Sequence, residues 1–312
     1  MYIESGGINK TMTQPTIDTT QTLLVGLTFG LPRQSRELKE LEANPKVKEI
    51  TKAAAGATRY SLHYWKWDEG SKKHDGLESL KQFQYAYKSA LEHFARFPFA
   101  TGAKLLPAAL VEPFLKVKEV YEKQQSEVWK HWIYEEYPKL ATSAPTRMGQ
   151  FYSGEDFPTA EECMERFVCE VTMIPLASAD QWQRIAILAP DLAAAQQKVT
   201  DEAYSRGIKE AHAKLWADVM KPIQHAVDTL SKDKSKIYDS LVGNIIDIVD
   251  LIPAYNNVFE DPHLETLAAE AKKAFAKIKP DDLRKSAEAK ASVLNSAKSI
   301  ISSFSQYQRK FA

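Results

Sequence analysis

Residues 93–108 read HFARFPFATGAKLLPA, and the Gly-Ala-Lys tripeptide within them raises the question of a phosphate-binding loop. A Walker loop needs two spaced glycines, then a lysine and a hydroxyl, between a strand and a helix. Here Lys104 is followed by Leu105, and a helical pattern precedes the tripeptide. The sequence therefore argues against a nucleotide site. Two interpretations remain: a packed corner of a helical hairpin, which we favour, and an exposed docking tip.

The docking interpretation depends on the apolar character of this corner. Pro98 and Pro107 restrict the path of the chain, and an apolar tip that stays exposed usually has a partner. The residues that would form the tip are Phe97, Phe99, Lys104, Leu105 and Leu106.

The residue types used for metal binding and nucleophilic catalysis are present, but their spacing does not suit either role. None of the seven histidines belongs to an HExxH motif, and Pro262 interrupts the Glu260–His263 pair. No GxSxG motif occurs. Cys163 and Cys169 lack CxxC spacing, so we expect reduced, packed thiols. We therefore predict a protein that is not an enzyme, with no catalytic residue, metal or cofactor.

Basic residues are in excess near the C-terminal end. From residue 270 onward there are ten lysines and arginines and four acidic residues. This excess allows two interpretations, a solvated helix surface, which we favour, and a nucleic-acid contact surface. The weak candidates for nucleic-acid contacts are Lys272, Lys273, Lys277, Arg284 and Lys285.

Composition is that of an ordinary globular protein. The chain has 312 residues, of which 44% are hydrophobic and 26% charged, and its 41 basic residues balance 41 acidic ones. No global field therefore draws it to nucleic acid or a membrane. No apolar run reaches the ~18 residues of a membrane span, and the first 21 residues do not read as a secretory signal. We expect a cytoplasmic protein without membrane association.

Apolar periodicity predicts a mainly helical chain. Residues 22–31 and 166–176 read as strands, and 181–188 as a third strand that would pair with 166–176. A turn is expected at 68–76 and a loop at 143–158, and Thr159 with Glu162 predicts a capping box for a short helix at 160–166. Helices are expected at 33–42, 46–65, 77–97, 112–140, 191–230, 236–252, 261–278 and 280–311.

These elements predict a mainly α fold: an elongated helical bundle or coiled coil with long helical hairpins and a small sheet of about three strands. We divide the chain into an N-terminal arm (1–21), a helical hairpin region with the sheet (22–189), and a long helix with a C-terminal helical region (190–312).

Three stretches together resemble a domain-of-unknown-function family from phages, plasmids and integrating elements. They are HFARFPF with GAKLLPA, RMGQFYSGEDFP with ERF, and NIIDIVDLIPAYNNVFEDPHLETLA. Phe94, Phe99 and Lys104 depart from the Tyr, Trp and Arg usual in that family. The resemblance implies no catalytic residues. It implies a gene context beside a MoxR-type AAA+ ATPase and a von Willebrand A-domain protein.

Two functions follow as expectations. The first is a non-enzymatic helical adaptor of a phage or mobile element, acting in the cytoplasm of a bacterial host. Its partners would be the AAA+ ATPase, the von Willebrand A-domain protein, or both. The second is a nucleic-acid-binding accessory protein in phage recombination or replication. Both leave homo-oligomerisation open.

Overall fold

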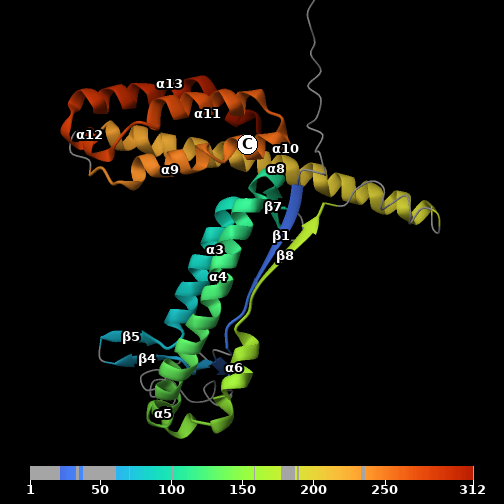
Figure 1. Cartoon of the computed structure of the whole chain (residues 1–312), viewed down its shortest axis with the longest axis vertical. Coiled ribbons are helices and arrows are strands. Elements are labelled where there is room, and N and C mark those ends of the chain that lie inside the picture. Colours follow the sequence, from blue (N-terminus) through green and yellow to red (C-terminus); the bar gives the residue numbers. More distant parts are fainter. Residues whose placement is uncertain are drawn as a thin grey trace, which may run out of the picture. The chain divides into compact units, whose positions relative to one another are not determined.

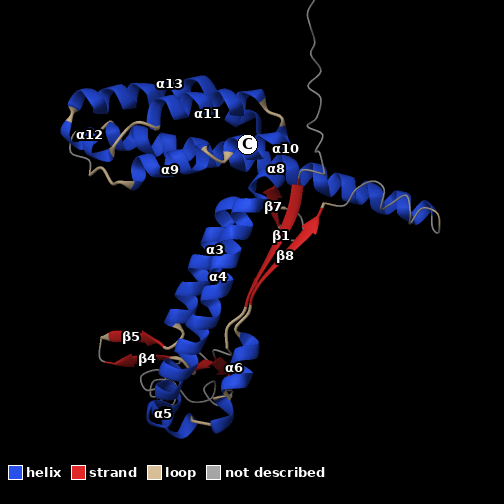
Figure 2. Ribbon diagram, viewed as in Figure 1, coloured by secondary structure: helices blue, strands red, loops and turns tan. Residues whose placement is uncertain are grey.

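The structure, a computed structural model, describes most of the chain as helix, with small sheets (Figures 1 and 2). The chain divides into two compact units. The first contains the described residues up to Val25, Ala95–Val111 and those from Met173 onward; the second contains Gly26–Phe94 and Glu112–Thr172, where described. The described residues are 22–32, 35–37, 61–69, 71–99, 102–157, 159–176, 187, 190–232 and 236–311.

The first unit contains a helical bundle. Its helices α8 and α11 each contact both α9 and α13, so the four helices form a bundle in which each helix packs against two others (Figure 1). Two short helices connect them, with α10 before α11 and α12 before α13. No helix in the described part of the chain is long and apolar enough to cross a membrane. The bounds are α8 Pro190–Leu230, α9 Ser240–Val249, α10 Ile252–Phe259, α11 Pro262–Phe275, α12 Pro280–Lys285 and α13 Ala287–Phe311.

Helix α8 has 41 residues, and its two halves differ in packing. From Ile208 onward its apolar side chains recur at helical spacing and are buried. The preceding half extends beyond the other bundle helices (Figure 1), and Val199 there is 60% exposed. Pro222 lies inside the helix without ending it, since buried neighbours on both sides hold the segment helical.

A four-stranded sheet has the strand order β6-β7-β1-β8. Antiparallel pairing places Leu23 opposite Leu106, and Phe97 opposite Leu105. Strand β6 contacts α8, and β7 contacts α10, so the bundle covers this part of the sheet. The strands are β1 Thr22–Phe29, β6 Phe97–Pro98, β7 Lys104–Pro107 and β8 Cys169–Pro175.

The lack of a side chain at Gly207 in α8 leaves space for the ring of Phe99, which directly follows β6. A Cβ atom at Gly207 would lie 2.7 Å from Cε2 of Phe99, whose ring is buried against Tyr204. Replacing Gly207 with alanine is therefore expected to lower the free energy of unfolding by about 1–3 kcal/mol, despite alanine's higher helix propensity. Chemical denaturation would measure this, and adding Phe99→Leu should recover part of the loss. A double variant no more stable than G207A would contradict the proposed clash.

The second unit has an antiparallel pair of helices joined to small strands (Figure 2). Helices α3 and α4 are in contact, because Tyr87 of α3 stacks on Tyr121 of α4 with 4.9 Å between ring centroids. A π-helical turn, Trp132–Glu136 (η4), continues α4 into α5. The remaining bounds are β2 Ser35–Glu37, β3 Ser61–His63, β4 Lys66–Glu69, β5 Lys72–Asp75, α3 Glu78–Phe94, α4 Val111–His131, α5 Tyr137–Met148 and α6 Ala160–Arg166, with short 3-10 turns at Ala108–Leu110, Gly149–Phe151 and Gly154–Asp156.

Aromatic side chains form the core of this unit. Trp65 and Trp132 are fully buried, with 5.8 Å between their ring centroids. Trp132 Nε1 also donates a hydrogen bond of 2.7 Å to the Gly76 carbonyl oxygen. These contacts join the segment around β4 and β5 to η4.

Several predictions from the sequence are confirmed. The strands at 22–31 and 166–176 correspond to β1 and β8, which are neighbours in one sheet. The helices predicted at 77–97, 112–140 and 191–230 correspond to α3, α4 with its continuation, and α8. Thr159 and Glu162 form the expected capping box of α6. The strand predicted at 181–188 lies outside the described residues apart from Ile187, as do the arm (1–21) and most of the helices predicted at 33–42 and 46–65.

Other predictions are wrong. Ser35–Glu37 is strand β2, paired with β3, where helix was expected. Residues 66–69 and 72–75 pair as strands, so among the described residues of the predicted turn only Ser71 and Gly76 are turn residues. The predicted loop at 143–158 begins as the end of α5, because Leu140, Ala144 and Met148 are buried at helical spacing. The sheet has four strands, and the elongated coiled coil is not confirmed. The two compact units are each built from separate segments of the chain, and the predicted domain division at residue 190 stays a prediction.

Candidate functional site

The predicted docking tip does not form a surface. Phe97, Phe99, Leu105 and Leu106 are buried, and Lys104 alone of the five is partly exposed. They belong to β6, β7 and the turn between these strands. Burial of the four apolar side chains corrects the docking interpretation, because they are not available to a partner protein.

Tyr255 of α10 holds this corner in place. Its hydroxyl accepts a hydrogen bond of 2.9 Å from the Arg96 backbone N–H and donates one of 3.3 Å to the Leu105 carbonyl oxygen. Its ring meets that of Phe97 with 4.8 Å between centroids. Burial raises the pKa of Tyr255 above its ordinary range, so the hydroxyl stays protonated and can donate. The corner is therefore a packing element.

The five cationic residues predicted as weak nucleic-acid contacts separate into two groups. Lys272, Lys273 and Lys277 are exposed on or just after α11, and Lys272 forms an ion pair of 2.8 Å with Asp250. Arg284 and Lys285 lie in α12, where both line a pocket. The structure thus brings two of the five candidates together at one site.

The pocket has a volume of about 970 Å³. It lies at the end of the bundle where α8 ends and α13 begins, and α12 forms part of its wall. Small-molecule sites in proteins have volumes of roughly 300–1,000 Å³. The pocket is therefore large enough for a group the size of a nucleotide. We call it the basic pocket for the residues that follow.

Positive charge predominates in the basic pocket. Its charged lining residues are Lys236, Arg284, Lys285, Lys290 and a single acid, Asp239. None of the three lysines forms an ion pair with a carboxylate among the residues described; Lys290 Nζ donates instead to the Lys232 carbonyl oxygen at 2.7 Å. A concave surface lined by one sign of charge concentrates counter-ions of the other sign. The pocket is suited to an anion.

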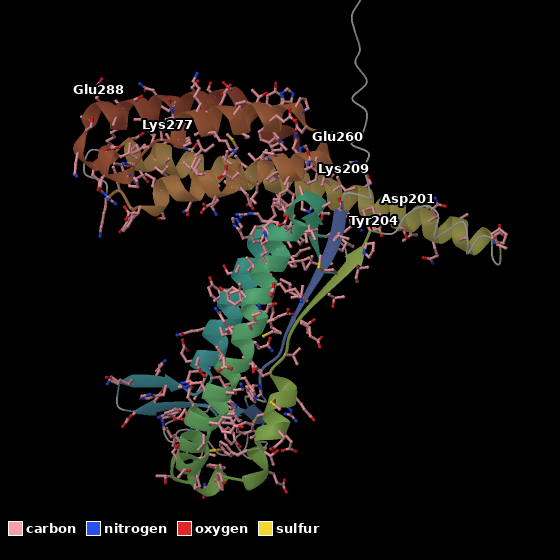
Figure 3. The ribbon with its side chains drawn as sticks, in the orientation of Figure 1. Asp201, Tyr204, Lys209, Glu260, Lys277 and Glu288 are labelled. Carbon is pink, nitrogen blue, oxygen red and sulfur yellow. The ribbon has the colours of Figure 1, made fainter. Side chains whose placement is uncertain are left out.

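Acidic residues adjoin the basic pocket without lining it. Figure 3 shows Glu288 at the start of α13, at the end of the bundle that carries α12. Asp281 forms an ion pair of 2.7 Å with Arg284, but Asp281 itself is not a lining residue. These two acids therefore lie beside the pocket and are not part of its lining.

Arg284 holds the wall of the pocket together. Its Nε and Nη2 donate hydrogen bonds of 2.9 Å and 2.8 Å to the Ile237 carbonyl oxygen, and it also pairs with Asp239 and Asp281. The hydrogen bonds to Asp239 and, next, Asp281 raise the pKa of Arg284. The hydrogen bond from Arg284 and the nearby charge of Lys285 lower the pKa of Asp281. Arg284 is thus occupied within the protein, and the lysines remain for a ligand.

An exposed aromatic ring completes the pocket. Tyr238 lines it and is 59% exposed, although tyrosine normally buries much of its ring. The ammonium group of Lys236 lies 5.0 Å from the centroid of that ring, within the range of a cation–π contact. An aromatic surface and several cations therefore share one open site.

A buried polar cluster elsewhere in the bundle is the main alternative candidate. His212 Nε2 and Trp216 Nε1 donate to Oδ2 of Asp261 at 2.9 Å and 3.0 Å, and the His263 N–H donates to Oδ1 at 2.9 Å. Burial alone would raise the pKa of Asp261, but these hydrogen bonds outweigh it and lower the pKa. His212 and Asp261 are almost inaccessible to solvent. The cluster therefore joins helices and does not meet a ligand.

Metal and thiol chemistry gain no support from the described part of the chain. It contains no group of three or more His, Cys, Asp or Glu side chains that could hold a metal ion. Cys163 and Cys169 are buried thiols that form no disulfide. Burial raises the pKa of each thiol to about 11. Both are therefore protonated near neutral pH and weakly nucleophilic.

Sequence reasoning missed Lys236, Tyr238 and Lys290 as site residues. The stretch SKDKSKIYD (231–239) is rich in charge and contains an aromatic residue, which was the available signal. Its proximity to Lys285 and Lys290 arises from the folding of α12 and α13 against the end of α8, which no local pattern encodes.

Comparison with protein-family models, with curated proteins and with solved structures finds no significant match to this chain. The chemistry of the basic pocket is therefore the basis for assigning a function.

Proposed function

We propose that this protein is a non-enzymatic, nucleic-acid-binding accessory protein, and that phosphate groups of the nucleic acid bind in the basic pocket. The observation that carries the proposal is the convergence of Lys236, Lys285 and Lys290 on one open site. Ammonium groups pair readily with phosphates and release the counter-ions condensed on the nucleic acid. The expected setting is recombination or replication in a phage or mobile element.

The proposal predicts how affinity depends on salt. Replacing Lys236, Lys285 and Lys290 by glutamine should make the slope of log affinity against log salt less negative by about 2, since each single-strand contact contributes about 0.7. At about 0.1 M salt this corresponds to binding about 100-fold weaker. Fluorescence anisotropy with a labelled single-stranded oligonucleotide would measure both quantities.

A matched control separates the pocket from net charge. The triple substitution K116Q/K123Q/K130Q removes the same charge from exposed positions on α4, in the other unit. It should leave the affinity within about twofold, since few phosphate contacts are expected there. Equal losses in the two triple variants would contradict a specific role for the pocket, and no binding by the unmodified protein at low salt would contradict the proposed function.

A second candidate is the adaptor function, in which this protein binds a MoxR-type AAA+ ATPase or a von Willebrand A-domain protein. It is favoured by the half of α8 that extends beyond the bundle, with Val199 60% exposed. It also draws on the family resemblance of the sequence. Because the predicted docking tip is buried, the extended half of α8 replaces it as the proposed contact surface. Binding of a purified ATPase or von Willebrand A-domain protein should be measured with the unmodified protein and with a V199E variant. Failure of both candidates to bind the unmodified protein would contradict this function.

A further inference from the structure

We infer that the basic pocket binds single-stranded nucleic acid in preference to duplex, with one unpaired base stacked on Tyr238. This inference rests on the proposed function and names the form of nucleic acid that the pocket selects. It is carried by the combination of an exposed ring and three lysines in the lining of one pocket.

The backbone at Tyr238 is fixed on both sides of the ring. Ile237 before it is buried, and its carbonyl oxygen accepts two hydrogen bonds from Arg284. The Tyr238 carbonyl oxygen accepts a hydrogen bond of 3.1 Å from the Leu241 N–H at the start of α9. The side chain of Asp239, the next residue, pairs with Arg284. A ring on a fixed backbone loses little conformational freedom when a ligand stacks on it.

The exposed ring of Tyr238 is matched to a nucleobase. Aromatic side chains that meet successive bases are typical of single-strand binding surfaces, and stacking tolerates any base because every base has a flat π face. The ammonium group of Lys236 lies over one face of the ring, 5.0 Å from its centroid, so a base would stack on the opposite face, with Lys236 near enough to contact its phosphate. The pocket volume of about 970 Å³ allows both groups to be accommodated together.

Duplex nucleic acid cannot offer the same contact. Its bases are stacked on one another, so exposing a base face requires unstacking and unpairing. The lysines would still attract the phosphates of a duplex, because that attraction does not depend on strand number. We therefore assign affinity in general to Lys236, Lys285 and Lys290, and strand preference to Tyr238.

The test compares a fifteen-nucleotide oligothymidine with a duplex of equal length, using the full chain and anisotropy at fixed salt. Tyr238→Ala should weaken single-strand binding about tenfold and leave duplex binding within about twofold. Tyr238→Phe, which keeps the ring, should restore most of the single-strand affinity. Tyr134→Ala is the matched control, since Tyr134 is 73% exposed in the other unit.

The outcomes separate this inference from the proposed function. The inference would be overturned if the protein bound single strand and duplex equally, and if the lysine substitutions weakened both while Tyr238→Ala weakened neither. The proposed nucleic-acid-binding function would then still hold. Loss of duplex and single-strand binding to the same extent in Tyr238→Ala would also overturn the inference. If the unmodified protein binds neither form at low salt, both proposals fail. Circular dichroism of each variant establishes that it is folded before binding is compared.

Discussion

Asp261→Ala is expected to lower the free energy of unfolding of the helical bundle by about 3–5 kcal/mol. The carboxylate accepts hydrogen bonds from His212 and Trp216 and caps the N-terminus of α11 through the His263 N–H. Its removal leaves two buried donors without a partner and removes a helix cap, which alone is worth about 1 kcal/mol. Urea denaturation followed by circular dichroism would measure the change.

Two comparisons identify the cause of that loss. Asp250→Ala removes an exposed carboxylate paired with Lys272 and should cost less than about 1 kcal/mol. Asp261→Asn keeps a capping side chain but removes the charge, so its loss should fall between the other two. If Asp261→Ala were no more destabilising than Asp250→Ala, the buried cluster would have no structural role.

The same cluster predicts a dependence of stability on pH. The pKa of Asp261 is lowered from its ordinary value of 3.8 in the folded protein. Its contribution to stability is therefore present above that value and is lost as the pH falls through the lower folded pKa. The variant Asp261→Asn should lack this component, and its stability should fall less steeply than that of the unmodified protein in this acid range.

Trp132→Ala is expected to lower the free energy of unfolding of the second unit by about 3–5 kcal/mol. Trp132 is fully buried, contacts Trp65 and Trp129, and donates to the Gly76 carbonyl oxygen. The substitution leaves a large cavity and an unsatisfied acceptor. Thermal and chemical denaturation monitored by tryptophan fluorescence would report the change.

Tyr134→Ala is the control for this second prediction. Tyr134 lies in the same π-helical turn but is 73% exposed, so its loss should change stability by less than about 0.5 kcal/mol. Trp132→Phe keeps much of the packing and should cost about 1–3 kcal/mol for the lost donor. A Trp132→Ala variant as stable as Tyr134→Ala would show that the aromatic cluster does not stabilise this unit.

Where one local rule determined the structure, the sequence was sufficient to predict it. The periodic apolar residues of α3 and α8 predict helices because burial on one side requires the 3.6-residue repeat. Thr159 and Glu162 predict a helix start because they satisfy each other's backbone N–H groups. These signals depend on neighbours a few residues apart.

The errors lie where distant contacts decide the outcome. The segment RYSLHYW (59–65) was predicted as helix, but within its described part β3 pairs with β2, and Trp65 is buried against Trp132. Phe97 to Leu106 is apolar enough for a docking tip, yet α8 and α10 cover it, which cannot be known before these helices are placed.

The basic pocket shows the same limit. Arg284 and Lys285 were identified from the local excess of positive charge, whereas Lys236 and Tyr238 lie 46 to 49 positions earlier in the sequence. Only the return of α12 to the end of α8 brings them together. The excess of basic residues in the sequence therefore identified Arg284 and Lys285, whereas Lys236 and Tyr238 could be identified only from the tertiary structure.

The most direct measurement of the central claim is the position of bound nucleic acid on the protein. A single-stranded oligonucleotide carrying photoreactive 4-thiothymidine would be crosslinked to the full chain, and the modified peptides identified by mass spectrometry. We predict adducts in the peptides that contain Lys236 and Tyr238, or Lys285 and Lys290. Adducts confined to other parts of the chain, such as α4 or the exposed lysines of α11, would contradict the claim that the basic pocket is the binding site.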